Sequence, residues 1–235
     1  KRRAETPEEE IALWVQRKEE GWTCVKGGFF PINSRAVNFR RTLEEGIEHL
    51  ARVRAAVGAE FDIIAEIHTK ANPQAAIEFC NRAEPYRPLW VEEASQLESE
   101  VLAEVRQIRT QTRVPLGTGE RLCSRYDFAP LCSAALADCF RIEVSPHNPQ
   151  SEVSTLASLH VCACTPNCQL LEVGSGQDPF WQDLFYGGLF RYDRGYAELP
   201  EKPGLGLDLD EKIAAKYPCQ EKHFRSPVFP DGSIT

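Results

Sequence analysis

Three short apolar runs in the middle of the chain each end in a glutamate, and the intervals between these glutamates are nearly constant. The runs FDIIAE, PLWVE and VPLGTGE end at Glu66, Glu92 and Glu120, so the intervals are 26 and 28 residues. The segments between the runs have helical periodicity. Two parallel strands need a crossover of about this length, with a helix in it. The sequence therefore predicts an α/β fold of parallel strands alternating with helices, as in a (β/α) barrel.

The three glutamates are expected to meet, because the carboxyl ends of barrel strands converge on one face, where such barrels carry out chemistry. Three carboxylates gathered there repel one another unless a cation neutralises them. Carboxylate oxygens are hard ligands, which suit Mg²⁺. We therefore predict a Mg²⁺ site formed by Glu66, Glu92 and Glu120.

Six strand-like segments alternate with helical ones, fewer than the eight of a closed barrel. The expected strands are WTCVKGG, FDIIAEIH, PLWVEE, VPLGTGE, FRIEVSP and CQLLEVG. Helices are expected to begin after Thr6 and Asn72, each followed by a proline that suits the first helical position. Residues 1–176 are thus predicted to form an incomplete (β/α) barrel, and residues 177–235 a C-terminal tail wrapping the same domain. An open barrel exposes a strand edge, which predicts a homo-oligomer.

Composition narrows the classes of protein to which the chain could belong. A net charge of −8 gives no overall bias toward nucleic acid, and no apolar run is long enough to span a membrane. Nine cysteines, an odd number scattered through apolar segments, predict reduced thiols in a cytoplasmic protein. Cys162, Cys164, Cys168 and Cys219 lack the usual spacing of a zinc site, so core thiols are the favoured interpretation. The chain begins at Lys1 and contains no methionine, which indicates a fragment or a processed form.

Two histidines lie beside expected strand ends and are candidates for acid-base chemistry. His68 follows Glu66 by two residues, and period-two alternation along a strand puts both on one face. His147 lies in SPHNPQ, where flanking prolines stiffen the loop, and imidazole is a natural acid and base near neutral pH. Glu172 ends the last expected strand and could hydrogen-bond a bound ligand. Arg121 follows the third acidic position and could pair with a carboxylate of the ligand. The alternative is an exposed strand end, a loop histidine and salt-bridged surface charges.

The strand-end motifs occur in a definite order. AEIHTK is followed by YRPLWVEEA, PLGTGERLCSRYDF, SPHNPQSEVST and LLEV, and then by YAELPEKPGLGLDLDE and FPDGSI. This series resembles the sugar-acid dehydratases of the enolase superfamily, in the D-galactonate dehydratase branch of the mandelate racemase group. The resemblance extends from about Gly21 onward. It implies a TIM-type (β/α) barrel that uses Mg²⁺ to remove water from a small sugar acid.

The resemblance also implies a role for each candidate residue. His147 matches the base that removes the proton α to the carboxylate, and His68 matches the acid that helps the β-hydroxyl leave. Glu172 matches a last-strand carboxylate that contacts the substrate. The three strand-end glutamates match the metal ligands.

The chain departs from the family pattern in several places. No counterpart of the N-terminal capping domain or of the first barrel strand is present, and Glu66 stands where the family usually has aspartate. ALADCF resembles the beginning of one strand of the family, but RIEVSPH, which follows it directly, resembles the next strand. The segment between these two strands, about one βα unit, is therefore missing. His147 is therefore expected to lack its usual carboxylate partner, because Glu143 is not at a matching position. Gly28 follows Lys26 where other branches carry Lys-x-Lys, so a lysine base is not predicted.

Two functions from different classes follow. The first is a Mg²⁺-dependent acid-sugar dehydratase, a carbon-oxygen lyase acting on a small molecule. The second is a truncated relative that retains the ligands but acts as a binding or structural protein, because a catalytic barrel requires its strands to close.

Overall fold

The structure, a computed structural model, divides into two compact units. The first comprises residues 4–140, and the second comprises residues 141–235 together with residues 1–3. The domain boundary near residue 176 that the sequence suggests remains a prediction. The described residues are 6–30, 39–95, 102–135, 144–168, 170–174, 184–186 and 192–218.

A parallel four-stranded sheet forms the centre of the first unit, and its order follows the chain. Gly28 lies opposite Glu66, Glu66 opposite Glu92, and Glu92 opposite Gly117, so the carboxyl ends of the strands are level. The parallel α/β architecture predicted from the sequence is confirmed. The strands are β1 (Cys24–Gly28), β2 (Asp62–Glu66), β3 (Trp90–Glu92) and β4 (Leu116–Gly117).

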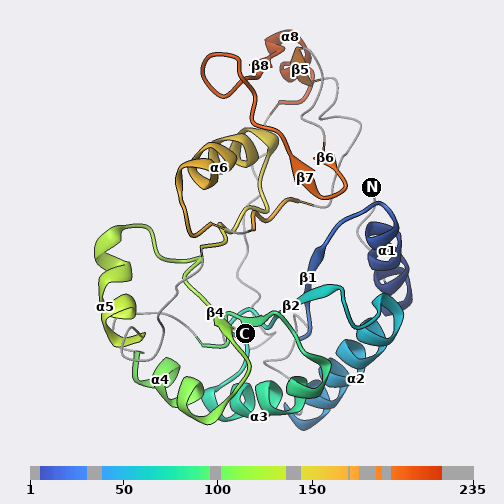
Figure 1. Cartoon of the computed structure of the whole chain (residues 1–235), viewed down its shortest axis with the longest axis vertical. Helices are drawn as coiled ribbons and strands as arrows, with labels where there is room; N and C mark the ends of the chain where they lie inside the picture. Colours follow the sequence, from blue (N-terminus) through green and yellow to red (C-terminus); the bar gives the residue numbers. More distant parts are fainter. Residues whose placement is uncertain are drawn as a thin grey trace, which may run out of the picture. The chain divides into compact units, whose positions relative to one another are not determined.

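Helices of the first unit form an arc outside this sheet, with one helix between each pair of consecutive strands (Figure 1). A single 3-10 turn, η2 (Glu84–Tyr86), extends the third helix. Such an arrangement makes each crossover a βαβ unit, as the spacing of the glutamates requires. The helices are α1 (Pro7–Glu19), α2 (Phe39–Val57), α3 (Pro73–Ala83), α4 (Leu102–Gln111) and α5 (Arg125–Ala135).

Two helix starts have the capping that the sequence predicts. The hydroxyl of Thr6 accepts a hydrogen bond from the backbone N–H of Glu9 at 3.2 Å. The side-chain oxygen of Asn72 accepts one from the backbone N–H of Ala75 at 2.9 Å. Each bond satisfies an N–H that has no partner within its helix, a contribution of roughly 1 kcal/mol.

The core of the first unit lies between the sheet and the arc of helices. From α2 it receives residues at helical spacing, and Leu50, Val53 and Val57 are fully buried. From β2 it receives Ile63, also fully buried. Each such aliphatic side chain stabilises the fold by roughly 1.5–3 kcal/mol. This packing fixes the position of the sheet, and with it the position of the residues at the strand ends.

The second unit is built from one long helix and short antiparallel ladders. Strand β5 pairs with β8, and β6 forms a hairpin with β7. The cysteines that the structure describes are free thiols. The expected core position is wrong for Cys164, which is exposed at the end of α6, and Cys162 and Cys168 are only partly buried. Cys219 lies outside the described residues. The elements are α6 (Glu152–Cys164), β5 (Phe185–Tyr186), β6 (Tyr192–Asp193), β7 (Tyr196–Ala197), β8 (Asp208–Leu209) and α8 (Glu211–Ala214).

The last two expected barrel strands do not form a ladder in the described residues. FRIEVSP and CQLLEVG meet in one parallel bridge, between Val144 and Cys168. Residues 140–143 and 169 lie outside the described part of the chain. Proline limits further pairing because it has no N–H to donate, and Pro146 and Pro149 follow the bridge closely. In the described part of the chain, four of the six expected strands therefore make the sheet.

Among the residues that the structure describes, no helix combines the length and the apolar character needed to cross a membrane.

Candidate functional site

Glu66 and Glu92 lie side by side at the ends of β2 and β3, with the ammonium of Lys26 between them. Lys26 Nζ is 2.5 Å from Glu92 Oε1 and 3.2 Å from Glu66 Oε2. Lys26 comes from β1, two residues before Gly28, which is the direct partner of Glu66 in the sheet. Alternation along the strand therefore turns Lys26 toward the same face as the two acids. One positive charge neutralises part of the charge on two carboxylates.

Burial dominates the electrostatics of Glu66, whose residue surface is 1% exposed. Loss of hydration, together with the adjacent charge of Glu92, raises the pKa of Glu66 to about 7, despite the opposing effect of Lys26. Glu66 Oε1 accepts a hydrogen bond from the backbone N–H of His68 at 2.7 Å. Glu66 Oε2 is buried and is paired with the ammonium of Lys26 at 3.2 Å.

Glu92 is held by its own strand as well as by Lys26. The indole N–H of Trp90 donates to Glu92 Oε2 at 3.0 Å, which is geometrically natural for residues two apart on a strand. The Trp90 ring lies against Gly117 of β4, where an added Cβ would come within 2.4 Å of Trp90 Cδ1. Only glycine fits at residue 117 while the indole keeps this position, so the Gly-x-Gly segment serves to seat Trp90.

Glu120 lies in the turn after β4, and one of its carboxylate oxygens is within 4.8 Å of a carboxylate oxygen of Glu92. At the carboxyl ends of neighbouring strands, Glu66 thus lies beside Glu92, and Glu92 lies near Glu120. The potential ligand atoms that lie within 4.8 Å of one another include those of Glu92 and Glu120 but not that of Glu66. We call Glu66, Glu92 and Glu120 the carboxylate cluster. Carboxylate oxygens at a rigid sheet edge suit a hard divalent cation such as Mg²⁺.

Glu93 supports this edge in a way that the sequence analysis missed. It is 1% exposed, and its Oε1 accepts hydrogen bonds from the backbone N–H of Gly119 at 2.9 Å and the hydroxyl of Thr118 at 3.1 Å. Burial raises the pKa of Glu93, and the nearby charge of Glu120 acts in the same direction. Its backbone has φ of +50°, which turns the chain sharply after β3. The only sequence signal was a paired glutamate followed by a Gly-x-Gly loop.

His68 does not lie on a strand, which corrects the expectation based on alternation. Strand β2 ends at Glu66, and both His68 and Thr69 have positive φ, 53° and 56°. The turn nevertheless keeps His68 Nδ1 3.8 Å from Glu66 Oε1, with the imidazole about half exposed. Arg121 is exposed and donates a hydrogen bond to the Thr69 hydroxyl at 3.3 Å. Both candidates therefore belong to the loops beside the carboxylate cluster.

In the second unit, His147 has a carboxylate partner, contrary to the expectation from the sequence. His147 Nδ1 lies 3.0 Å from Oε2 of Glu172. The sequence analysis assigned Glu172 to the substrate and left His147 without an orienting acid. The two residues are 25 positions apart, and no local pattern connects them, so only the tertiary structure reveals the pair.

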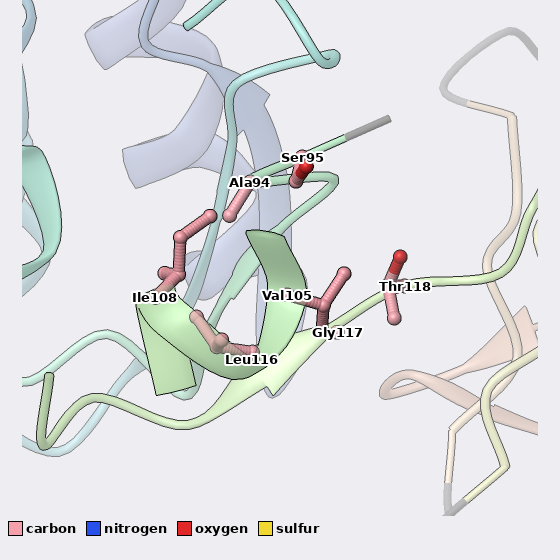
Figure 2. A pocket seen from close by; sticks show the side chains of 7 residues that line it. All are labelled: Ala94, Ser95, Val105, Ile108, Leu116, Gly117 and Thr118. Atoms are coloured by element: carbon pink, nitrogen blue, oxygen red, sulfur yellow. The ribbon is translucent and has the colours of Figure 1, made fainter. Parts of the chain in front are cut away.

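A small apolar pocket lies between β4 and α4, on the core side of the sheet edge (Figure 2). Its volume is about 10 Å³, which is room for one water at most. A sugar acid does not fit there, so this pocket is a packing defect of the core and not the substrate site. Its lining residues are Ala94, Ser95, Val105, Ile108, Leu116, Gly117 and Thr118.

Comparison with known proteins gives a family match over most of the chain. The family described as "Enolase C-terminal domain-like" matches residues 10–144 and 131–213. The two matched stretches overlap at residues 131–144, the segment where the sequence predicts a missing βα unit.

Curated relatives with a similar sequence are sugar-acid dehydratases. A D-gluconate dehydratase of Thermoproteus tenax is 32% identical over 198 residues, which cover 74% of this chain and 39% of the relative. A D-galactonate dehydratase of Ralstonia nicotianae is 26% identical over 247 residues, covering 88% of this chain and 63% of the relative. The chain therefore spans less than two thirds of these relatives.

Solved structures of similar fold are also longer than this chain. A mandelate racemase/muconate lactonizing enzyme-like protein from Rubrobacter xylanophilus superimposes with a TM-score of 0.79 at 29% identity. The superposition covers 92% of this chain and 62% of that protein. The four-stranded parallel sheet with its outer helices is thus part of a larger fold in the neighbour.

Proposed function

Because this chain belongs to the enolase C-terminal domain-like family, we propose that it carries the metal and acid-base residues of an acid-sugar dehydratase, a carbon-oxygen lyase that uses Mg²⁺. The observation that carries the proposal is the carboxylate cluster, in which Glu66 and Glu92 are direct sheet partners. Relatives named D-gluconate and D-galactonate dehydratase support the substrate class.

The carboxylate cluster would hold the cation. Glu66, Glu92 and Glu120 would each offer a carboxylate oxygen, and Lys26 offsets part of the charge of Glu66 and Glu92 while no cation is bound. Bound Mg²⁺ would polarise the substrate carboxylate and stabilise the negative charge that develops on it. Arg121, exposed beside Thr69, is proposed to contact the anionic substrate.

The proposed chemistry divides proton transfer between two histidines. Nε2 of His147 accepts the proton from C2, the carbon next to the carboxylate, and the C–H electron pair forms a double bond between C2 and the carboxylate carbon. When this pair moves to form a double bond between C2 and C3, the bond from C3 to its hydroxyl breaks, and His68 supplies the proton with which that hydroxyl leaves as water. The resulting enol takes up a proton at C3, which gives a 2-keto-3-deoxy acid.

Incubation of the full chain with D-gluconate or D-galactonate tests this proposal. We expect a 2-keto-3-deoxy acid to form with Mg²⁺, and no product to form when a chelator removes the metal. Glu92→Gln serves as the inactive variant, and Glu78→Gln, on the exposed side of α3, serves as the matched control that leaves activity unchanged. Product formation that continues in excess chelator would contradict the proposal.

The second candidate is a relative that binds a metal and a sugar acid without turnover. A sheet with four strands in the described residues favours it, because a catalytic barrel requires its strands to close. This candidate predicts saturable binding of Mg²⁺ and of the sugar acid. It also predicts that the proton next to the carboxylate does not exchange with solvent.

A further inference from the structure

The contact between His147 and Glu172 joins two residues to which the sequence assigned separate tasks. His147 Nδ1 and Glu172 Oε2 are 3.0 Å apart, a hydrogen-bond distance. Their side chains are 31% and 22% exposed, so the pair is partly shielded from water. A carboxylate at this distance favours the tautomer with hydrogen on Nδ1, which leaves the lone pair on Nε2.

The carboxylate of Glu172 is itself fixed in place by the residue next to the histidine. The backbone N–H of Asn148 donates to the same Oε2 at 3.0 Å. The Asn148 side-chain amide donates to the backbone carbonyl of Glu172, also at 3.0 Å. Two bonds from one residue therefore tie the segment around Glu172 to the loop that carries His147.

A buried anchor extends this arrangement into α6. Asn148 is fully buried, and its amide also donates to the hydroxyl of Thr155 at 2.9 Å. Thr155 is 2% exposed and donates in turn to the backbone carbonyl of Ser151 at 3.3 Å. Buried polar groups that satisfy one another hold a unique geometry, because breaking any bond leaves a desolvated partner.

From this geometry we infer that Glu172 is the orienting carboxylate of His147, a positioning residue for the proposed base. The inference rests on the proposed function. Glu172 accepts hydrogen from Nδ1, keeps the imidazole in one rotamer and stabilises the imidazolium that forms when Nε2 gains a proton. The task that the family places on an aspartate of another strand is thus performed here by a residue that the resemblance assigns to the substrate.

Nitrogen-15 NMR of the full chain with labelled histidine tests the pairing without any need for turnover. The signals of His147 are identified by their loss in His147→Asn. In the native protein we expect Nδ1 to carry hydrogen and Nε2 to be unprotonated at a pH where the ring is neutral. In Glu172→Leu we expect the tautomer with hydrogen on Nε2 to become the major one. Glu198→Gln, exposed in the same unit, should leave the spectrum unchanged.

Hydrogen on Nε2 in the native protein, or hydrogen that stays on Nδ1 in Glu172→Leu, would overturn the inference. If Glu172→Leu does not fold, Glu172→Gln provides the readout, because its amide still accepts a hydrogen bond but carries no charge. Bonds to a charged acceptor are shorter and stronger, so the Nδ1 proton should move upfield in Glu172→Gln. An unmoved proton would count against the pairing.

Kinetics separate the orienting role from a substrate contact if dehydration is observed. An orienting residue predicts that Glu172→Gln lowers kcat by roughly tenfold or more while KM changes little. A residue that only contacts substrate would instead raise KM and leave kcat nearly constant. Absence of dehydration would contradict the proposed function alone, because the tautomer of His147 is measured independently.

Discussion

The two units hold their candidate chemical groups in different ways. In the first unit, Glu66 and Glu92 are adjacent because β2 and β3 are hydrogen-bonded in register. Apolar residues of these strands pack in the core against α2 and the neighbouring helices. In the second unit, His147 follows a single-bridge pairing and depends on its contact with Glu172, whose carboxylate also accepts a hydrogen bond from the backbone N–H of Asn148. A backbone ladder distributes the constraint over many groups, whereas a polar network concentrates it in a few.

This difference determines how each part should respond to mutation. A substitution within the carboxylate cluster changes charge and metal affinity while the sheet keeps its geometry. A substitution in the network around Asn148 changes geometry itself. Substitutions in each part therefore separate these two responses.

The largest effect is expected from the two histidines, which should fail in different steps. His147→Asn should slow exchange of the substrate's α-proton with solvent by roughly 10²-fold or more, because the base is lost. His68→Asn should preserve that exchange while blocking loss of the hydroxyl. Deuterium incorporation from heavy water, followed by NMR, measures the first step, and product formation measures the second. Loss of exchange in both variants, or in neither, would defeat the assignment.

Lys26→Met should strengthen binding of a divalent cation to the cluster by roughly tenfold. The ammonium lies between Glu66 and Glu92, so a metal must compete with it, and its removal adds attraction for the cation. The metal-free protein should lose about 1–3 kcal/mol of unfolding free energy, because two neighbouring carboxylates then lack their partner. Lys18→Met, on α1, is the control for loss of one positive charge away from the cluster. Weaker metal binding in Lys26→Met would mean that the lysine assists the site.

Asn148→Ala should destabilise the second unit by about 2 kcal/mol and leave metal affinity unchanged. The change removes the amide bonds to Thr155 and to the Glu172 carbonyl, and buried groups without partners cost roughly 1–3 kcal/mol. Urea unfolding measures the stability, and calorimetry measures the metal affinity. Equal stability of Asn148→Ala and the native protein would show that the network does not constrain the loop.

Glu93→Ala should have the smallest effect, a severalfold loss of metal affinity, with the histidines unaffected. The Gly119 N–H and the Thr118 hydroxyl lose their acceptor, and the turn that carries Glu120 is less constrained. Glu93→Gln keeps an oxygen in the same place and should retain most of the affinity. Calorimetric titration with Mn²⁺ compares the two. If Glu93→Ala binds the metal with the affinity of the native protein, Glu93 does not help to position the metal ligands.

The features that local patterns encode could be predicted from the sequence. Constant spacing between Glu66, Glu92 and Glu120 required parallel crossovers, and parallel strands align their carboxyl ends. Capping residues marked two helix starts, because Thr6 and Asn72 each supply an oxygen to a free N–H. These inferences use contacts between near neighbours or the geometry common to all parallel sheets.

Features that depend on tertiary contacts or unusual backbone could not be predicted. Positive φ at His68 and at Glu93 is uncommon for residues with side chains, and no glycine marks either turn. The pairing of His147 with Glu172 joins distant segments through two hydrogen-bonded side chains. Two expected strands, FRIEVSP and CQLLEVG, have apolar runs typical of strands, yet only Val144 and Cys168 pair among the described residues.

The central claim is that the carboxyl ends of β2, β3 and β4 form one site for a divalent cation. Isothermal titration calorimetry of the full chain with Mg²⁺, or with Mn²⁺ as the spectroscopically visible substitute, tests it directly. We predict one saturable site whose affinity falls by at least roughly tenfold in each of Glu66→Gln, Glu92→Gln and Glu120→Gln, because each variant removes a charged oxygen ligand. Glu78→Gln should bind as the native chain does. Binding that is absent from the native chain, or that survives all three substitutions unchanged, would contradict the claim.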